Sequence, residues 1–106
     1  MDVMRDVGEN GQTHSPGWSV KALQFLVEER NVGAIGHETS DTDPAITGAF
    51  EGYPGERFIL SSNRYQVELM INLDQVPEAG AIIFCTFPKV TDATGFTARC
   101  FALCEK

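Results

Sequence analysis

The chain has 106 residues, a formal net charge of −7 and 42% hydrophobic residues. This length is typical of one domain, and a content of 22% charged residues is typical of a globular protein. The acidic balance excludes nucleic acid and anionic membranes as expected partners, because phosphate groups attract lysine- and arginine-rich surfaces. The longest apolar run, 79–87, is far shorter than the ~20 residues that span a bilayer, and we see no leader peptide. We therefore expect a cytoplasmic protein that contacts no membrane.

The three cysteines, Cys85, Cys100 and Cys104, form an odd set without CxxC spacing. Buried free thiols in a reducing cytosol are the favoured interpretation, and a disulfide or metal role is the alternative. Cys85 lies in the middle of an apolar segment, which is an unsuitable place for a thiolate nucleophile.

The N-terminal part combines a polar arm with a first helix. Residues 1–15 are polar and aperiodic, which predicts an arm that is flexible or ordered by a partner, and residues 16–106 are expected to form one α/β domain. Apolar residues at helical spacing predict a helix over Ser19–Arg30, with Ser19 as its N-cap and Asn31 as its end. The polar strip of this helix is narrow, so much of its surface should be covered.

A strand and two short helices are expected next. Residues Val32–Gly36 are small and apolar, as in a central strand. Asp43 followed by Pro44 is typical of an N-cap with proline at the first helical position, which predicts a helix near Pro44–Phe50. A second short helix is predicted over Glu56–Ser62.

The remaining elements are mostly strands. We predict an extended segment over Tyr65–Glu68, a helix over Leu69–Val76, and strands over Ala81–Phe87 and Thr97–Cys104. The fold class expected is α/β, with a mixed sheet and helices packed on it.

The strand predicted at Ala81–Phe87 has no polar alternation, so both of its faces need cover. The helices of the chain can cover one face, and a second chain is expected on the other, because soluble monomers rarely expose large apolar patches. We therefore expect a homo-oligomer, most simply a two-fold dimer.

Glu68 is the first candidate for a functional residue, because its carboxylate lies between Val67 and Leu69. A buried charge without a partner costs several kcal/mol, so this group must leave the apolar surface or find a partner. One interpretation is structural, with Glu68 bonding a neighbouring strand or capping the next helix. The other is contact with a metal or a substrate.

His37, Glu38 and Arg99 are candidate substrate-binding residues. His37 and Glu38 close the first strand, where α/β proteins often place functional groups. Asp41 and Asp43 add oxygens that a divalent cation could use, although the spacing matches no tight metal motif. The alternative is that both aspartates are turn and cap residues and that His37 is exposed. Arg99 could contact a substrate carboxylate or pair with an acidic residue of the protein.

Three segments carry a resemblance to a known family: PGWS at Pro16–Ser19, GHETSDTDP at Gly36–Pro44, and the run from Glu56 to Arg99. Together they resemble the cyclase family of metal-dependent hydrolases, which includes bacterial kynurenine formamidases. The resemblance covers roughly residues 15–104 and corresponds only to the C-terminal part of such an enzyme. The family's main metal motif, His-x-Gly-Thr-His-x-Asp, belongs upstream of these segments. The resemblance implies a swivelling β/β/α fold without its N-terminal strands.

The resemblance also implies roles for two carboxylates. A glutamate at the place of Glu68 serves the metal centre in the family, which makes Glu68 the candidate catalytic residue. In much of the family a histidine serves the same centre at the position that Glu56 occupies here. Carboxylates still bind hard ions such as Mn²⁺ and Mg²⁺, so Glu56 and Glu68 are the candidate metal ligands.

Two functions are consistent with these patterns. The favoured one is a stand-alone truncated cyclase-like module that is not catalytic alone, needs no cofactor, and retains a small-molecule pocket and an oligomeric surface. The alternative is a metal-dependent hydrolase of the cyclase or arylformamidase type, which cleaves an amide or cyclic amide C–N bond with Mn, Mg or Zn. That enzyme would need metal ligands from another chain, because His14 and His37 do not reproduce the family's histidine-rich centre.

Overall fold

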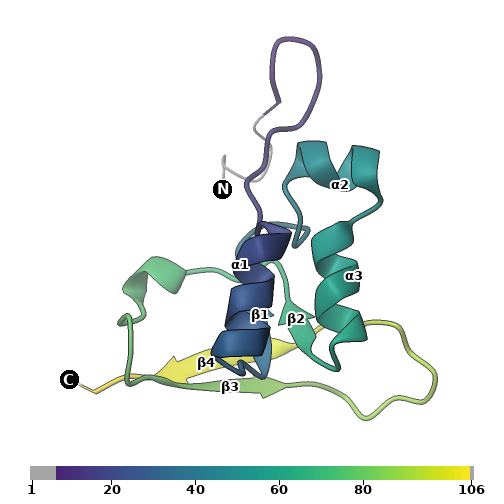
Figure 1. The fold of residues 1–106 in the computed structure, drawn as a ribbon. Helices are drawn as coiled ribbons and strands as arrows, with labels where there is room; N and C mark the ends of the chain where they lie inside the picture. The colour runs from purple at the N-terminus through teal and green to yellow at the C-terminus, as the bar shows by residue number, and fades with distance from the viewer. Residues whose placement is uncertain (1–6, 106) are drawn as a thin grey trace. The chain divides into compact units, whose positions relative to one another are not determined.

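The computed structural model describes residues 7–105 (Figure 1). Its internal contacts divide the chain into two compact units, with the boundary between Ile71 and Asn72. Helices and short strands together confirm the predicted α/β class. None of the helices in the described part is long and apolar enough to cross a membrane.

The predicted N-terminal arm is described only in part, because residues 1–6 lie outside the described residues. Residues 7–15 contain a turn in which Val7 and Thr13 form an isolated antiparallel bridge. Flexibility of the arm, and its ordering by a partner, both remain predictions.

The first helix begins where the sequence indicates. The hydroxyl of Ser19 accepts a hydrogen bond from the backbone of Ala22 at 3.2 Å and caps α1 (Val20–Gln24). The helix continues as a turn of π-helix, η2 (Phe25–Glu29), and the backbone leaves the helical conformation at Asn31, whose φ is 49°. The predicted start and end of this helix are thus confirmed.

The core of the N-terminal unit lies between two helices and a pair of strands. β1 (Ala34–Gly36) and β2 (Tyr65–Val67) pair in parallel. The core residues come from α1, β1 and a later helix, α3 (Pro54–Ser61), and they are Leu23, Ile35 and Ile59. Trp18, Leu26, Val27 and Phe58 pack against them.

The two short predicted helices are present as α2 (Ala45–Glu51) and α3 (Pro54–Ser61). The role predicted for Asp43 is wrong, because no side chain caps α2 and Pro44 occupies its N-cap position. The carboxylate of Asp43 instead accepts hydrogen bonds from the backbone of Gly55 at 2.7 Å and of Glu56 at 2.9 Å. Amide groups at the start of a helix have no partner within the helix itself. Asp43 supplies that partner and therefore caps α3, which begins well beyond it in the chain.

The loop before α1 packs tightly on this turn. The backbone of Trp18 donates to the carbonyl of Thr42 at 2.7 Å. A Cβ on Gly17 would lie only 2.3 Å from the carbonyl carbon of Asp43. Only glycine fits this approach of two backbones, which explains the glycine in the PGWS segment.

The predicted helix over Leu69–Val76 is wrong. Only a single 3₁₀ turn forms, η3 (Leu73–Gln75), and Leu69 has a positive φ of 55°. The reason is tertiary: the amide of Leu69 donates to the carbonyl of Thr39, and the amide of Met70 donates to that of His37. These bonds tie the segment to the loop after β1 in a conformation that a helix cannot adopt.

The C-terminal unit is an antiparallel ribbon of β3 (Ile82–Thr86) and β4 (Arg99–Leu103). Both strands were predicted. We expected one mixed sheet, but in the described residues the strands form two separate pairs, β1–β2 and β3–β4. Phe84 lies opposite Phe101, and their rings stack with centroids 5.0 Å apart. Cys85 lies opposite Cys100, one position further along.

Candidate functional site

The candidate site lies at the carboxyl edge of the parallel β1–β2 pair. His37 follows β1 and Glu68 follows β2, and the last residues of the two strands are register partners. The backbone amide of His37 donates to the carbonyl of Val67 at 3.0 Å, and the amide of Met70 donates back to the carbonyl of His37 at 3.0 Å. Glu68 is therefore held between two backbone hydrogen bonds, at an edge where α/β proteins bind ligands.

Four side chains form a hydrogen-bonded row, the His37 relay, which consists of His37, Thr42, Gln66 and Glu68. The Thr42 hydroxyl donates to Oε1 of Gln66 at 2.7 Å, and Nε2 of Gln66 donates to Oε1 of Glu68 at 2.9 Å. Nε2 of His37 lies 3.2 Å from the Thr42 oxygen. Oxygen atoms of Thr39 lie equally close to Nδ1, so either ring nitrogen of His37 can carry the hydrogen. The hydrogen bond from Gln66 orients the Glu68 carboxylate.

His37 is buried, with 8% of its surface exposed, so the alternative of an exposed histidine is wrong. Burial lowers the pKa of His37, and the Thr39 carbonyl and the charge of Asp41 partly oppose this effect. Nδ1 lies 3.1 Å from the Thr39 carbonyl oxygen and 2.9 Å from the Thr39 hydroxyl. Both ring nitrogens are thus engaged by the protein itself, and substrate binding by His37 stays a prediction.

Glu68 stands among other carboxylates. Its pKa is raised, first by burial and then by the negative charges of Glu56 and Asp41, while the hydrogen bond from Gln66 lowers it. We call Asp41, Glu56 and Glu68 the carboxylate cluster. Like charges held together in this way are common at functional sites, although structural networks show them as well.

Glu56 reaches the cluster because of the cap described above. Its backbone amide is held by the buried carboxylate of Asp43, which fixes the first turn of α3. The sequence identified Glu56 and Glu68 as candidate metal ligands, and the charge of Glu56 acts on Glu68 in the structure. Glu38, the neighbouring substrate-binding candidate, is exposed.

The residues present do not form a metal site by themselves. Among residues 7–105, no group of three or more His, Cys, Asp or Glu side chains is arranged to hold a metal ion. The carboxylate cluster offers oxygen atoms only, and the nitrogens of His37 are already engaged. A catalytic zinc site normally has three protein ligands and contains histidine or cysteine, which this cluster does not supply.

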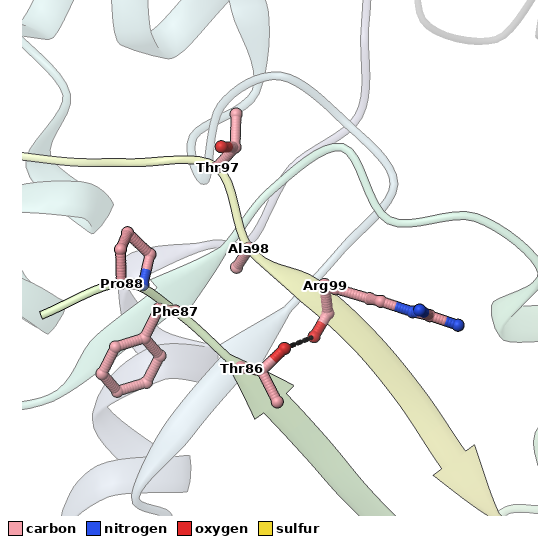
Figure 2. Close-up of a pocket in the computed structure, with 6 residues that line it drawn as sticks. All are labelled: Thr86, Phe87, Pro88, Thr97, Ala98 and Arg99. Atoms are coloured by element: carbon pink, nitrogen blue, oxygen red, sulfur yellow. Dashed lines mark hydrogen bonds between the residues drawn. The ribbon is translucent and has the colours of Figure 1, made fainter.

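Arg99 belongs to the C-terminal unit and is one of the residues that line an open hollow (Figure 2). The hollow has a volume of about 520 Å³, and its lining comes from the ends of β3 and β4 and the residues beside them: Thr86, Phe87, Pro88, Thr97, Ala98 and Arg99. The Thr86 hydroxyl donates to the Arg99 carbonyl at 3.0 Å, while the Arg99 guanidinium points away from the Phe87 ring (Figure 2). The role of Arg99 in substrate binding stays a prediction.

Sequence reasoning did not single out Thr42 or Gln66. For Gln66 a signal was present, because residues two apart in a strand point to the same face, and Gln66 precedes Glu68 by two positions. Thr42 carries no such local signal, since its burial depends on the loop before α1 that packs over it.

Taken together, the fold and the site define an α/β module with a partly buried polar relay and a carboxylate cluster at one sheet edge. No family model matches the chain. The chain is, however, similar to an isatin hydrolase of Roseibium aggregatum, with 31% identity over 94 residues, which make up 88% of this chain and 35% of that protein.

Solved structures give the same result. Isatin hydrolase A from Ralstonia solanacearum matches with a TM-score of 0.82 and 33% identity, over 95% of this chain and 38% of that chain. An isatin hydrolase bound to the product analogue thioisatinate matches with a TM-score of 0.85 and 27% identity, over 99% of this chain and 40% of that one. Isatin hydrolase A from Labrenzia aggregata, bound to benzyl benzoate, matches with a TM-score of 0.75 and 32% identity, over 86% of this chain and 36% of that chain.

The chain therefore spans 35% to 40% of the length of these relatives. The similarity supports the cyclase-like resemblance seen in the sequence and the expectation that this chain corresponds to one part of such a protein.

Proposed function

We propose that this chain is a cyclase-like partial module that is not catalytic alone and that binds a small molecule at the carboxylate cluster. The observation that carries this proposal is the coverage, because the match includes 88% of this chain but only 35% of the isatin hydrolase. The ligand we propose is a neutral cyclic amide of the isatin type, the class named in the relatives. A polar amide N–H can donate to the Glu68 carboxylate, whereas an anion would be repelled by the cluster.

Two measurements on the purified chain test this proposal. Isatin absorbance should stay constant over hours, and elemental analysis should find no stoichiometric Mn, Mg or Zn. About one metal ion per chain together with steady loss of isatin would overturn the non-catalytic assignment.

Ligand binding is tested separately by calorimetric titration with isatin. Glu68→Ala should weaken binding more than it changes the melting temperature, whereas Glu51→Gln, an exposed glutamate on α2 outside the cluster, should change neither. Equal binding by Glu68→Ala and the unmodified chain would remove Glu68 from the site. Should Glu68 instead be a structural acceptor, the same change lowers stability by ~1–3 kcal/mol.

The alternative function is a metal-dependent hydrolase of an amide or cyclic amide, with the missing ligands supplied by another chain. The raised pKa of Glu68 beside Glu56 and Asp41 favours it, because such crowding suits a site that a cation neutralises. Mixing this chain with the unmatched part of an isatin hydrolase, in the presence of Mn²⁺, should then produce isatin turnover. Absence of turnover in this mixture would contradict the alternative, and turnover that persists with Glu68→Ala would show that Glu68 is not needed for it.

We also propose that the module forms a homodimer through one face of the β3–β4 ribbon, the aromatic face, which carries Ile82, Phe84, Phe101 and Leu103. These side chains are 62%, 41%, 45% and 56% exposed, respectively. β3 contains no charged residue, and Arg99, at the first position of β4, is the one charged residue of the two strands on this face. An apolar face of this kind is usually covered in a soluble protein. We place the module in the reducing cytoplasm, since its three cysteines are unbridged.

A further inference from the structure

Two cysteines face each other across the C-terminal ribbon. Cys85 of β3 and Cys100 of β4 are register partners in the antiparallel pair. Because side chains alternate along a strand, both thiols lie on the face opposite the Phe84–Phe101 stack. The two thiols are hydrogen-bonded to each other, unbridged, and only half-buried. None of the three cysteines is fully buried, so the predicted burial is not confirmed.

The backbone positions suit a covalent bond between these thiols. Directly opposed residues in an antiparallel pair have Cα atoms about 4.5 or 5.5 Å apart. Disulfide-bonded cysteines have Cα atoms about 4.4 to 6.8 Å apart, so the strands need no rearrangement. We propose that Cys85 and Cys100 are a modification site, at which a low-molecular-weight disulfide such as oxidised glutathione converts the two thiols into a cross-strand disulfide.

The reaction is ordinary thiol–disulfide exchange. The thiolate of one cysteine attacks a sulfur of oxidised glutathione, which forms a mixed disulfide and releases one glutathione thiolate. The second cysteine loses its proton to solvent and attacks the protein sulfur of the mixed disulfide, which releases the second glutathione. Two protein thiols are oxidised to one disulfide, and one glutathione disulfide is reduced to two thiols. Burial and the contact with Cys100 raise the pKa of the Cys85 thiol, so the exchange should accelerate as the pH rises.

The bond would stabilise the ribbon. A two-stranded ribbon is marginally stable in water by itself. A disulfide between Cys85 and Cys100 closes the loop that contains Phe87, Pro88, Thr97 and Ala98, which line the hollow. Because cross-linking restricts the unfolded chain, the oxidised protein should melt at a higher temperature than the reduced one. The pair would thus act as a redox-controlled staple that leaves the aromatic face free.

Cys104 supplies the matched control. Cys104 is exposed and directly follows β4, four residues beyond Cys100. Four residues of strand separate two Cα atoms by about 13 Å, which is beyond the ~7 Å limit for a disulfide. Cys104 therefore cannot bridge Cys100 within one extended strand, and Cys85 is the partner that the register provides.

The test uses the full chain carrying Cys104→Ser, which keeps the proposed pair and removes the exposed third thiol. After incubation in glutathione buffers of increasing oxidised fraction, mass spectrometry should show a monomer that has lost two hydrogens and carries no glutathione. Peptide mapping should join Cys85 to Cys100, and the melting temperature should rise. Cys85→Ser, whose fold is checked by circular dichroism, should instead gain glutathione adducts without an internal bridge and without a rise in melting temperature.

Other outcomes would overturn the proposal. A Cys104→Ser protein that stays reduced, or that accumulates stable glutathione adducts at both cysteines, would show that the thiols cannot reach each other. Disulfide-linked dimers without any internal bridge would show that contact between chains dominates. An internal bridge that leaves the melting temperature unchanged would refute the staple.

Discussion

Asp43→Ala should destabilise the N-terminal unit by about 3–6 kcal/mol. The Asp43 carboxylate is 1% exposed and accepts two backbone hydrogen bonds, from Gly55 at 2.7 Å and from Glu56 at 2.9 Å. A hydrogen bond to a charged group contributes about 1.5–3 kcal/mol, and Gly55 is itself buried, so water cannot replace the lost acceptor. Loss of a helix cap alone costs about 0.5–2 kcal/mol.

Asp43→Asn refines this estimate, because asparagine retains one oxygen acceptor and loses the charge. It should therefore destabilise the protein by about half as much, roughly 1.5–3 kcal/mol. Urea unfolding followed by Trp18 fluorescence is a suitable assay, because Trp18 packs on the core and is bonded to Thr42, next to Asp43. Asp74→Ala, an exposed change in the other unit, should stay within about 0.5 kcal/mol. A loss below 1 kcal/mol for Asp43→Ala would show that the cap does not hold α3.

Three further results are expected. The pKa of Glu68 is raised above 4.5, so the folded state holds the proton of this carboxyl group more tightly than the unfolded state does. Stability is therefore lost as the pH rises from 4.5 through the raised pKa. Glu68→Gln should therefore raise the free energy of unfolding at pH 7 and flatten this part of the curve, which urea titrations from pH 4 to pH 7 would measure. The pKa of His37 is lowered below 6.5, so stability should fall as the pH drops below that value, and this slope should disappear with His37→Gln but persist with His14→Gln. Light scattering behind a sizing column should give a dimer mass for the unmodified chain and a monomer mass for Phe84→Asp, and a monomer mass for the unmodified chain would disprove the dimer.

Elements with local signals were predictable from the sequence. The N-cap at Ser19, the end at Asn31 and the apolar strand around Phe84 each depend on residues within a few positions of one another. The helix expected over Leu69–Val76 failed because Leu69 and Asn72 have positive φ, in a segment that hydrogen bonds tie to the loop after β1, far away in the sequence. Periodicity cannot detect a backbone bond of that range.

The site was predictable in its acidic residues but not in their connections. Glu68 was singled out because its carboxylate lies between apolar residues, Glu56 was identified through the resemblance, and the charge of Glu56 acts on Glu68 in the structure. The cap by Asp43 was assigned to the wrong helix, because the first amide that it bonds, that of Gly55, lies twelve residues further along the chain. The burial of His37 was missed for the same reason, since the side chains around it are brought there by tertiary contacts.

The carboxylate cluster also offers a direct way to detect what occupies the site. The hydrogen bond from Gln66 orients the Glu68 carboxylate, and the cap by Asp43 fixes the backbone of Glu56 in the first turn of α3. An occupant that brings a positive charge or an N–H donor would favour the ionised form of Glu68 and lower its raised pKa. Because ligands that bind only the folded state raise its stability, each such occupant should increase the melting temperature. This increase should be largest above the pKa of Glu68 and should be lost with Glu68→Gln, so binding at the cluster can be recognised before any reaction is known.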